Sequence, residues 1–449
     1  MMTIEEFGRR LRAKEITSEQ VTEECLERIE ADNDRLNAFI CVMADTARQR
    51  ARQADQELAA GRDRGPLHGV PLSIKDLLDI RGVATTAASR VREGHVADRD
   101  AATIAHLRQA GAVFVGKTNL HEFAFGTTNE DSAFGPARNP HDPSRSPGGS
   151  SGGSAASVAA GMALASIGTD TGGSIRIPAA ACGIVGLKPS AGEVSTDGVV
   201  PLSTTLDHVG SLAQSVADAT LVHHALLGDP TVSPPAPMPT SGLRLAVPRR
   251  YFCDLLDDEV RARFDEAIAR LGAAGVHVDD IEIRHAADIA PIYLHIVLSD
   301  AAAYHAHALE TVPQRYTAAV RLRLEMGRYI LAEDYVRALA GRQVLRREVD
   351  AALTQHDALL LPTLAIPAPP IGAETVQVGN AAESVRNIML RLTQPFNLTG
   401  HPAISLPSGM TSGGLPCAVQ LVGCTGQTDA LLRVAMACEV HISGVLTSG

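Results

Sequence analysis

Residues 145–178 read RSPGGSSGGSAASVAAGMALASIGTDTGGSIRIP, and the interpretation of the 449-residue chain starts from them. Ser150 and Ser174 each follow a pair of glycines, and an alanine-rich run separates them. Glycine lets the backbone approach a reacting group closely, so the pattern predicts two loops with exposed hydroxyls and bare N–H donors, joined by a buried helix. A flexible Gly/Ser linker would not alternate with the apolar run SVAAGMALASI and then enter IRIPAAACGIVGL.

These motifs resemble those of the amidase signature family. Related segments occur on both sides of the central stretch, so the resemblance covers nearly the whole chain. The matching segments are GVPLSIKD at residues 69–76, GGSSGGS at 148–154, GTDTGGSIR at 168–176, Pro-Ala at 178–179, CGIVGLKP at 182–189 and FNLTGHPAISLP at 396–407. The combination is specific, whereas a single glycine–serine cluster would be weak evidence.

The composition limits the classes of partner. The chain is 45% hydrophobic and 20% charged, with a formal net charge of −11. This is ample material for a packed core, and length alone would suggest two or three domains. The negative charge argues against a nucleic-acid backbone or an anionic membrane surface as the main partner. We therefore expect a small-molecule substrate, no nucleic acid and no membrane.

The seven cysteines form no C-x-x-C pair, and an odd number leaves at least one unpaired in any disulfide scheme. The first residues, MMTIEEFGRR, lack the apolar segment of a secretory signal. The longest run of small apolar residues, 154–168, is too short to span a bilayer. These features predict a reduced, cytoplasmic protein.

Helical and strand patterns alternate along the chain. Thr17 and Gln20 form a possible capping box that opens a helix reaching about residue 31. Other helices are expected at residues 45–60, 216–228, 257–271, 285–356 and 429–439, and strands at 69–75, 243–248, 358–361 and 403–406. This alternation predicts an α/β sandwich with a large mixed sheet.

The resemblance implies one amidase signature domain over residues 1–449, with the large mixed β-sheet sandwiched between α-helices. We expect four parts within it: a helical arm at 1–65, a catalytic core at 66–228, a proline-rich linker at 229–240, and the remainder of the sheet at 241–449. The helical segment at about 285–356 is expected to face the substrate.

Residues 111–118, GAVFVGKT, fit the Walker A pattern letter for letter. That motif needs a glycine-rich loop whose N–H groups face phosphate, whereas AVFV is a β-branched and aromatic run that favours a strand. We therefore reject nucleotide binding and place Lys117 at the end of a strand.

Hydrolysis of an amide needs an activated nucleophile, an oxyanion site and an acid for the leaving nitrogen. The resemblance implies that Ser174 is the nucleophile, Ser150 the bridging serine and Lys75 the base, with a cis peptide between Gly149 and Ser150. Lys75 accepts a proton only when neutral, and its reference pKa is about 10.4, so the site must disfavour the ammonium form.

Two further groups of residues complete the expected site. The oxyanion hole is assigned to the backbone N–H groups of Thr171, Gly172, Gly173 and Ser174. Ser151, Asp170 and Arg176 are expected to support it, with ordinary structural salt bridging as an equally weighted alternative for these residues. No cofactor, metal or nucleotide is expected, because the His and Cys residues show no ligand spacing.

A rival interpretation makes Ser150 the nucleophile of an α/β-hydrolase, since residues 148–152 also match G-x-S-x-G. That elbow must follow a strand, and the preceding RNPHDPSRSP cannot be one. His356 and His401 are possible bases, but nothing places either near Ser150.

A second rival is a component of an amidotransferase complex that resembles the glutamyl-tRNA amidotransferase A subunit. Tyr335 and Arg342 lie on one helix face and, with Asp334, could hold a substrate carboxylate, although a surface ion-pair face is the simpler interpretation. The sequence favours a free-standing hydrolase, a monomer or homodimer, acting on a small amide, anilide or carbamate.

Overall fold

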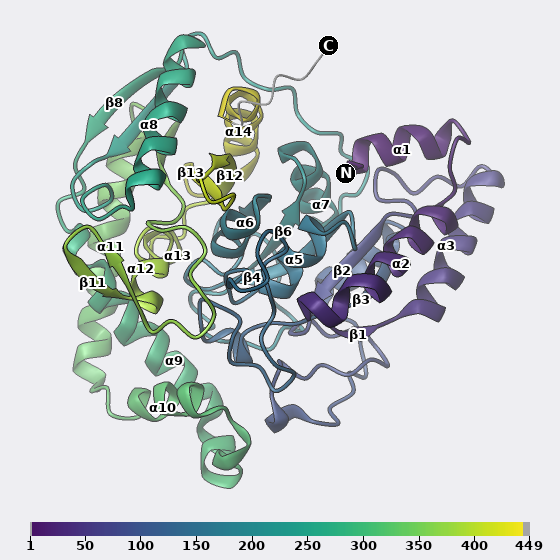
Figure 1. Ribbon diagram of the computed structural model, residues 1–449, viewed down its shortest axis with the longest axis horizontal. Coiled ribbons are helices and arrows are strands. Elements are labelled where there is room, and N and C mark those ends of the chain that lie inside the picture. The colour runs from purple at the N-terminus through teal and green to yellow at the C-terminus, as the bar shows by residue number, and fades with distance from the viewer. Residues whose placement is uncertain (1, 443–449) are drawn as a thin grey trace.

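The computed structural model describes residues 2–442 and contains one large mixed sheet of eleven strands in the order β1-β3-β2-β4-β6-β5-β12-β13-β9-β7-β8 (Figure 1). Helices pack along both of its faces, so the predicted α/β class with a large mixed sheet is confirmed. The strands are β1 (Phe39–Val42), β2 (Pro71–Lys75), β3 (Val113–Thr118), β4 (Ala165–Asp170), β5 (Val185–Lys188), β6 (His208–Ala213), β7 (Arg244–Pro248), β8 (His277–Ile281), β9 (Ala358–Pro362), β12 (Ala403–Met410) and β13 (Pro416–Val422).

Strand direction places the functional loops at one edge of the sheet. β2 runs parallel to both β3 and β4, with Leu72 opposite Ala165 and Ile74 opposite Ile167. Because parallel strands end at the same edge, the chain leaves β2 at Lys75 and β4 at Asp170 on the same side of the sheet. β6 then pairs antiparallel with β4 and returns the chain from that edge.

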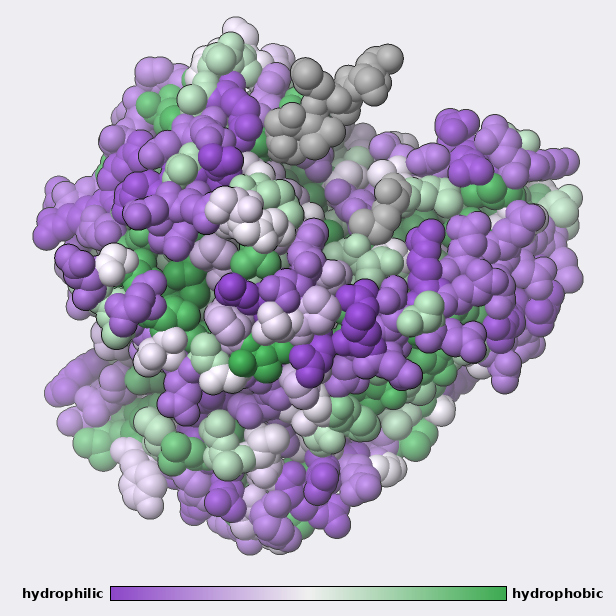
Figure 2. All heavy atoms as spheres, in the orientation of Figure 1, coloured by the Kyte–Doolittle hydropathy of each residue, from purple (hydrophilic) through white to green (hydrophobic). Residues whose placement is uncertain are grey.

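The N-terminal arm consists of α1 (Ile4–Arg12), α2 (Ser18–Leu36) and α3 (Ala44–Ala59). The Thr17–Gln20 capping box is present, but α2 continues past the predicted end and stops at Asn37, which is left-handed. Arginine–carboxylate pairs cover the outer side of the arm, including Arg48 with Glu23. Figure 2 shows this part of the surface as almost entirely hydrophilic, typical of a solvated face.

The segment between the two glycine–serine loops differs from the predicted single helix. It forms α5 (Gly152–Ala159), a short turn and then strand β4, followed by α6 (Arg176–Cys182). Gly161 takes a left-handed conformation with φ of 70° and ends the helical run. β4 has the sequence ASIGTD and is buried on both faces, so its residues do not alternate between an apolar core face and a polar solvent face that would have identified it as a strand.

The remaining helices lie mostly in the C-terminal half. The predicted helical segment near 285–356 is confirmed as three helices, and α9 packs against the other two. The helices are α4 (Ala102–Gln109), α7 (Val216–Leu227), α8 (Asp258–Ala273), α9 (Ile289–Thr311), α10 (Ala318–Gly327), α11 (Ala332–Leu353), α12 (Val385–Leu390), α13 (Pro395–Leu398) and α14 (Thr428–Ile442), with a separate hairpin of β10 (Thr375–Val378) and β11 (Ala381–Ser384).

One helical stretch, Ala286–Thr311, is long and apolar enough by length and composition to cross a membrane. Core helices meet the same criterion, and 44% of its most apolar window is buried inside the molecule. In this structure the helix is part of the α9–α11 layer visible at the lower left of Figure 1.

Residues 229–240 contain no helix or strand and are largely exposed. Strands from both sides of this segment belong to the same sheet, because β5 pairs with β12. The proline-rich segment therefore connects two parts of a single domain. Residues 113–118 of the Walker-like run form the buried strand β3, and Lys117 forms an ion pair of 2.9 Å with Asp76.

Candidate active site

Lys75 is the last residue of β2 and is fully buried. Its Nζ lies 2.8 Å from Ser150 Oγ and 2.7 Å from Thr169 Oγ1. Burial lowers the pKa of Lys75 to about 7, although the negative charges of Asp207 and Asp170 oppose this shift. The amine is therefore positioned to exchange a proton with Ser150 near neutral pH.

The backbone at Gly149, directly before Ser150, is enclosed by other parts of the chain. A Cβ on Gly149 would collide with the backbone nitrogens of Thr128 and Asn129, each 2.8 Å from its position, so only glycine fits there. The Gly149–Ser150 peptide is cis, as the resemblance implied. The Ser150 carbonyl accepts a hydrogen bond of 3.1 Å from the His121 N–H, which fixes this turn from the other side.

Ser174 lies on the loop between β4 and α6. It is 6% exposed, whereas Ser150 and Lys75 have no exposed surface. Within residues 2–442 its hydroxyl has no hydrogen-bond partner, while its carbonyl accepts from the Ser151 N–H at 3.2 Å. Of the three predicted catalytic side chains, Ser174 is thus the one that an incoming molecule can reach.

The loop before Ser174 has unpaired N–H groups. In the described part of the chain, the N–H groups of residues 171–174 donate to no protein acceptor. A Cβ on Gly172 would meet the Tyr293 hydroxyl, and one on Gly173 would meet Thr393 Oγ1. Gly173 also has a φ of 138°, which disfavours any other residue.

Asp170 and Arg176 form a fully buried ion pair below this loop. Arg176 Nη2 lies 3.0 Å from Asp170 Oδ1 and also donates to Asn397, while Nη1 donates to Gln420. Burial acts to raise the pKa of Asp170, but the charge and hydrogen bonds of Arg176 outweigh it and hold that pKa well below its usual range. Asp170 also accepts from the N–H of Ile175 at 3.1 Å, so the pair supports the loop directly.

Two more side chains fix the backbone around the site. Ser151 Oγ donates to the Thr169 carbonyl at 3.2 Å, which ties the start of α5 to β4. Thr171 Oγ1 donates to Asp207 at 2.6 Å. Burial raises the pKa of Asp207 to about 6, against the hydrogen bonds from Thr171 and from two backbone N–H groups.

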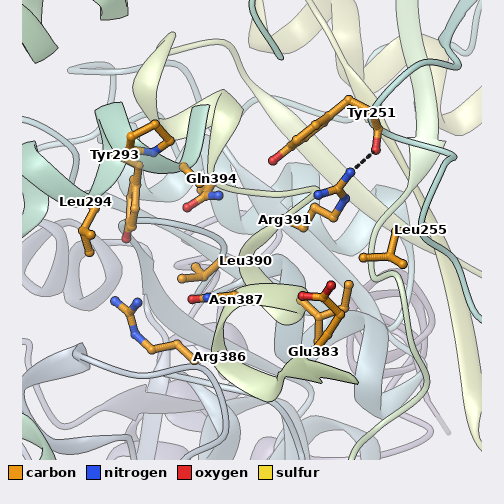
Figure 3. A pocket seen from close by; sticks show the side chains of 13 residues that line it. Tyr251, Leu255, Tyr293, Leu294, Glu383, Arg386, Asn387, Leu390, Arg391 and Gln394 are labelled. Atoms are coloured by element: carbon orange, nitrogen blue, oxygen red, sulfur yellow. Dashed lines mark hydrogen bonds between the residues drawn. The ribbon is translucent and has the colours of Figure 1, made fainter. Parts of the chain in front are cut away.

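A cavity of about 440 Å³ adjoins the loop (Figure 3). Two of its side chains reach Gly172: the Tyr293 hydroxyl and Leu390 Cδ2 are among the atoms closest to a Cβ built on that glycine. The cavity is lined by Tyr251, Leu255, Ala290, Pro291, Tyr293, Leu294, Glu383, Arg386, Asn387, Ile388, Leu390, Arg391 and Gln394. Its lining therefore contacts the loop at Gly172, and Lys75, Ser150 and Ser174 are not among the lining residues.

The structure brings together all the residues expected at the site from the sequence. It adds Thr169, Asp207 and the cavity residues Tyr293 and Arg386, which the sequence analysis missed. Thr169 lies inside the GTDTGGS motif and near the end of a buried strand. A polar side chain at such a position could have indicated a site residue from the sequence. Tyr293 and Arg386 come from α9 and α12, in regions without a motif.

The residues that the two rival interpretations single out have other groups of the protein as partners. His356 pairs with Asp279 and His401 with Asp350, each at 3.0 Å. No strand precedes Ser150 in residues 141–149, as expected for a chain without a nucleophile elbow. Tyr335 donates to Asp300 at 3.0 Å.

Arg342, the other proposed carboxylate ligand, donates to the carbonyls of Leu398 and Thr205 at 2.6 and 3.2 Å. Asp334 pairs with Arg337 at the surface at 3.4 Å. This helix face is therefore occupied by protein contacts.

A protein-family model described as Amidase matches residues 20–432 of the chain. The chain is similar to an amidase of Pseudomonas putida, with 39% identity over 98% of this chain and 95% of the relative. It is also similar to the A subunit of the glutamyl-tRNA(Gln) amidotransferase of Carboxydothermus hydrogenoformans, with 37% identity over 98% of this chain and 96% of the relative. A solved structure described as the crystal structure of an amidase superposes with a TM-score of 0.93 and 39% identity, covering 98% of this chain and 100% of that one.

Proposed function

The chain belongs to the amidase signature family, and from this premise we propose that it cleaves carbon–nitrogen bonds of small amides through an acyl-enzyme on Ser174. The observation that carries the proposal is the buried contact of 2.8 Å between Lys75 and Ser150, next to a reachable Ser174. A lysine whose pKa is lowered by burial to about 7 is partly uncharged at neutral pH and can accept a proton. An arginine stays charged and could not act as a base.

In the proposed first step, Ser174 Oγ attacks the amide carbonyl and forms a tetrahedral intermediate. Its proton passes to Ser150, while the proton of Ser150 passes to the neutral Lys75. The relay then runs in reverse and protonates the departing nitrogen, so the amine leaves neutral. A water molecule attacks the acyl-enzyme by the same route and releases the acid.

The negative charge of the intermediate is stabilised by the unpaired N–H groups of residues 171–174. A single donor of this kind contributes about 3 kcal/mol to the transition state in enzymes where it has been removed. The contacts of Asp170 with Ile175 and Arg176 hold these groups in place before the substrate arrives, so little reorganisation is needed during the reaction.

Carbamates are further proposed substrates, since their cleavage needs the same attack and the same protonation of nitrogen. We also place the protein in the cytoplasm, as a monomer or homodimer. All seven cysteines are free, which fits a reducing compartment.

The test is a hydrolysis panel of aliphatic amides, acyl anilides, glutamine and aryl carbamates with the wild-type chain and Ser174→Ala. We expect turnover of at least one class by the wild type and loss of at least 1,000-fold in the variant, by analogy with other nucleophile deletions. Ser241→Ala, at an exposed loop position, is the matched control and keeps full activity. A sulfonyl fluoride that labels Ser150 instead of Ser174 would refute the assignment of roles.

The glutaminase component of a tRNA-dependent amidotransferase is the second candidate, favoured by the similarity to the glutamyl-tRNA(Gln) amidotransferase relative. The protein partners of Tyr335 and Arg342 argue against a free carboxylate site on that helix. Size exclusion of the native protein together with a glutaminase assay decides between the two. Activity on glutamine that appears only in a complex with other proteins would favour the second candidate.

A further inference from the structure

Arg386 brings a positive charge to the cavity with no anion beside it. It belongs to α12 and is half-buried, and its Nε is enclosed without a hydrogen-bond partner. Within residues 2–442 its guanidinium has neither an ion pair nor a hydrogen bond, and its recorded contact is with the ring of Phe125, 6.0 Å from Cζ to the centroid. Arg391, which lines the same cavity, differs because it donates to the Tyr251 carbonyl at 2.7 Å and stacks on the Tyr251 ring.

The groups around Arg386 do not neutralise it. Arg323, from α10, lies over the same Phe125 ring at 5.9 Å and adds a second positive charge nearby. Burial lowers the pKa of Arg386, as expected for a cation in surroundings that offer it no carboxylate. Glu383 is the one carboxylate among the lining residues, and Figure 3 places it on the far side of the cavity from the Arg386 guanidinium.

The Arg386 guanidinium lies beside Tyr293 in the cavity. Figure 3 shows that it faces the hydroxyl end of Tyr293. That hydroxyl in turn lies against Gly172, whose N–H is part of the proposed oxyanion site. Tyr293 therefore contacts the loop at Gly172 and faces the Arg386 guanidinium with the same hydroxyl end.

We propose that Arg386 selects amides that also carry a carboxylate, which it binds as a charge-assisted pair in this cavity. An enclosed Nε without a partner is costly, and a carboxylate supplies the two acceptor oxygens that match the planar fork of a guanidinium. An uncharged amide of the same size leaves Arg386 unpaired, so it binds less tightly. This inference rests on the proposed function for its catalytic consequence, but the carboxylate site itself is independent of turnover.

Two kinds of substrate meet this description. In the monoamide of a dicarboxylic acid the carboxylate is on the acyl side, and in an N-acyl amino acid it is on the leaving amine. Both place a carboxylate at one end and a cleavable amide at the other. Their comparison shows which side of the scissile bond enters the cavity.

Binding is measured first, without catalysis. Calorimetry with glutarate and the Ser174→Ala chain is expected to show binding that is weakened at least tenfold when Arg386→Gln is added. Arg337→Gln, which removes the same charge at an exposed position of α11, is the matched control and leaves the affinity unchanged. No glutarate binding to Ser174→Ala, or equal binding with and without Arg386, would overturn the carboxylate site.

Steady-state kinetics then test whether the enzyme prefers amides that carry a carboxylate. Glutaramate is compared with hexanamide, and N-propionyl-β-alanine with N-propionyl-propylamine. The wild type is expected to favour the charged member of at least one pair by tenfold or more in kcat/KM. Arg386→Gln should remove this preference through a higher KM for the charged member alone, and Arg386→Lys should restore part of it.

The two proposals fail separately. Cleavage of charged and neutral members at equal rates, with no selective effect of Arg386→Gln, overturns the inference and leaves the proposed function intact. If neither these pairs nor the wider hydrolysis panel is cleaved, the proposed function is overturned, and the glutarate measurement still decides whether the carboxylate site exists.

Discussion

The pKa of Lys75 is about 7, far below the pKa of a lysine in water. Transfer from water into the protein interior disfavours the ammonium, and two neighbouring hydroxyl oxygens provide hydrogen bonds that a neutral amine also makes. The carboxylates that act on Lys75, Asp207 and Asp170, are not in direct contact with it and only partly restore its basicity. Enclosure therefore lowers the basicity of Lys75 and leaves a larger fraction of its amine neutral near pH 7, as the proposed role of base requires.

The first prediction is a pH profile. Below the pKa of about 7 the amine of Lys75 is protonated and cannot accept a proton, so kcat/KM is expected to fall about tenfold per pH unit as the pH decreases. Above that value kcat/KM should reach a plateau. Initial rates on one amide between pH 5 and pH 9, with Ser241→Ala as control, check this. An activity that is flat down to pH 5 would contradict the assignment of Lys75 as the base.

The second prediction separates the two roles of Lys75. The relay protonates the leaving nitrogen, whereas the alkoxide of an ester departs with less help. Lys75→Ala is therefore expected to reduce kcat more for an amide than for the matched ester, by about tenfold or more. Lys75→Met, which keeps the volume, serves as a second variant in case the alanine variant does not fold. Equal losses on both substrates would show that Lys75 does not act as the acid.

The sequence predicts the polar core of the site because Lys75, Ser150 and Ser174 lie in motifs with fixed glycines. It does not predict the residues that line the cavity. Tyr293 and Arg386 lie on α9 and α12, and the packing of these helices brings both to the cavity and Tyr293 to Gly172. In the sequence, neither Tyr293 nor Arg386 belongs to a motif or a spacing that would distinguish it from other residues of a helix.

At the scale of elements, the β4–α6 loop is the most constrained part of the chain. The carbonyls of Gly172, Gly173 and Ser174 each accept a hydrogen bond, whereas the N–H groups of residues 171–174 have no protein acceptor in the described part of the chain. Thr393 Oγ1 donates to the Gly172 carbonyl at 2.7 Å, which fixes the orientation of that peptide plane. Both glycines are required because the space for a Cβ is filled by Tyr293 and Thr393.

The third prediction concerns this loop. Gly173→Ala adds a Cβ that collides with Thr393 at a φ of 138°, so the loop must rotate and move at least one donor. We expect kcat to fall about 100-fold or more, with a much smaller effect on KM. Gly192→Ala is the control, because Gly192 has a φ of 75° but nothing within reach of its Cβ. Retention of wild-type kcat in Gly173→Ala would contradict the oxyanion assignment.

The Asp170–Arg176 pair joins four elements, because Arg176 in α6 also bonds Gln420 in β13 and Asn397 in α13, while Asp170 ends β4. Removal of one partner leaves the other charge buried and unpaired. Such a loss costs about 3–5 kcal/mol in other proteins. The pair therefore supports the loop and also connects the elements. The sequence analysis weighed these two roles, support of the site and structural salt bridging, as alternatives, and this contact is compatible with both.

The fourth prediction follows from the lowered pKa of Asp170. The unfolded chain binds a proton at this carboxyl near pH 4, whereas the folded protein does so only at much lower pH. The stabilisation is thus complete above about pH 4 and is lost as the pH falls further. Arg176→Met should lower the free energy of unfolding by about 3 kcal/mol or more at pH 7. In Asp170→Asn the loss of stability between pH 5 and pH 3 should be shallower than in the wild type, by urea titration.

The ends of helices can be predicted from the sequence only where a local capping residue marks them. The Thr17 cap fixes the start of α2, but its end at Asn37 is set by hydrogen bonds from the Asn37 side chain to the 134–136 backbone. The run between Ser150 and Ser174 was wrongly predicted as one helix. Its second half is a strand because tertiary pairing with β2 and β6 outweighs the helical preference of its alanines.

At the scale of the whole molecule, the sheet is continuous across the proline-rich segment. β12 and β13, from the last part of the chain, complete the sheet that β2, β4 and β6 begin. The connection at 229–240 is exposed and has no regular structure, yet the strand pairing across β5 and β12 is buried. Neither part has a complete set of strand partners alone.

The fifth prediction is that the two parts fold together. Calorimetry of the intact chain should show one cooperative transition. Residues 1–228 and 241–449, expressed separately, should each fail to give one, because each exposes an unpaired buried strand edge. A chain nicked within 229–240 should stay associated and active. Independent folding of either piece would show that the segment is a true domain boundary.

The tyrosines of the cavity have a spectroscopic consequence. The chain contains no tryptophan and six tyrosines, and two of these, Tyr251 and Tyr293, line the same cavity. Tyr293 lies against the loop that carries Ser174, and Tyr251 stacks under Arg391. The near-ultraviolet circular dichroism and emission of the native protein therefore carry a large contribution from this one place. A tryptophan introduced at Leu294 would be the sole indole in the molecule, an optical reporter of cavity occupancy that needs no external dye.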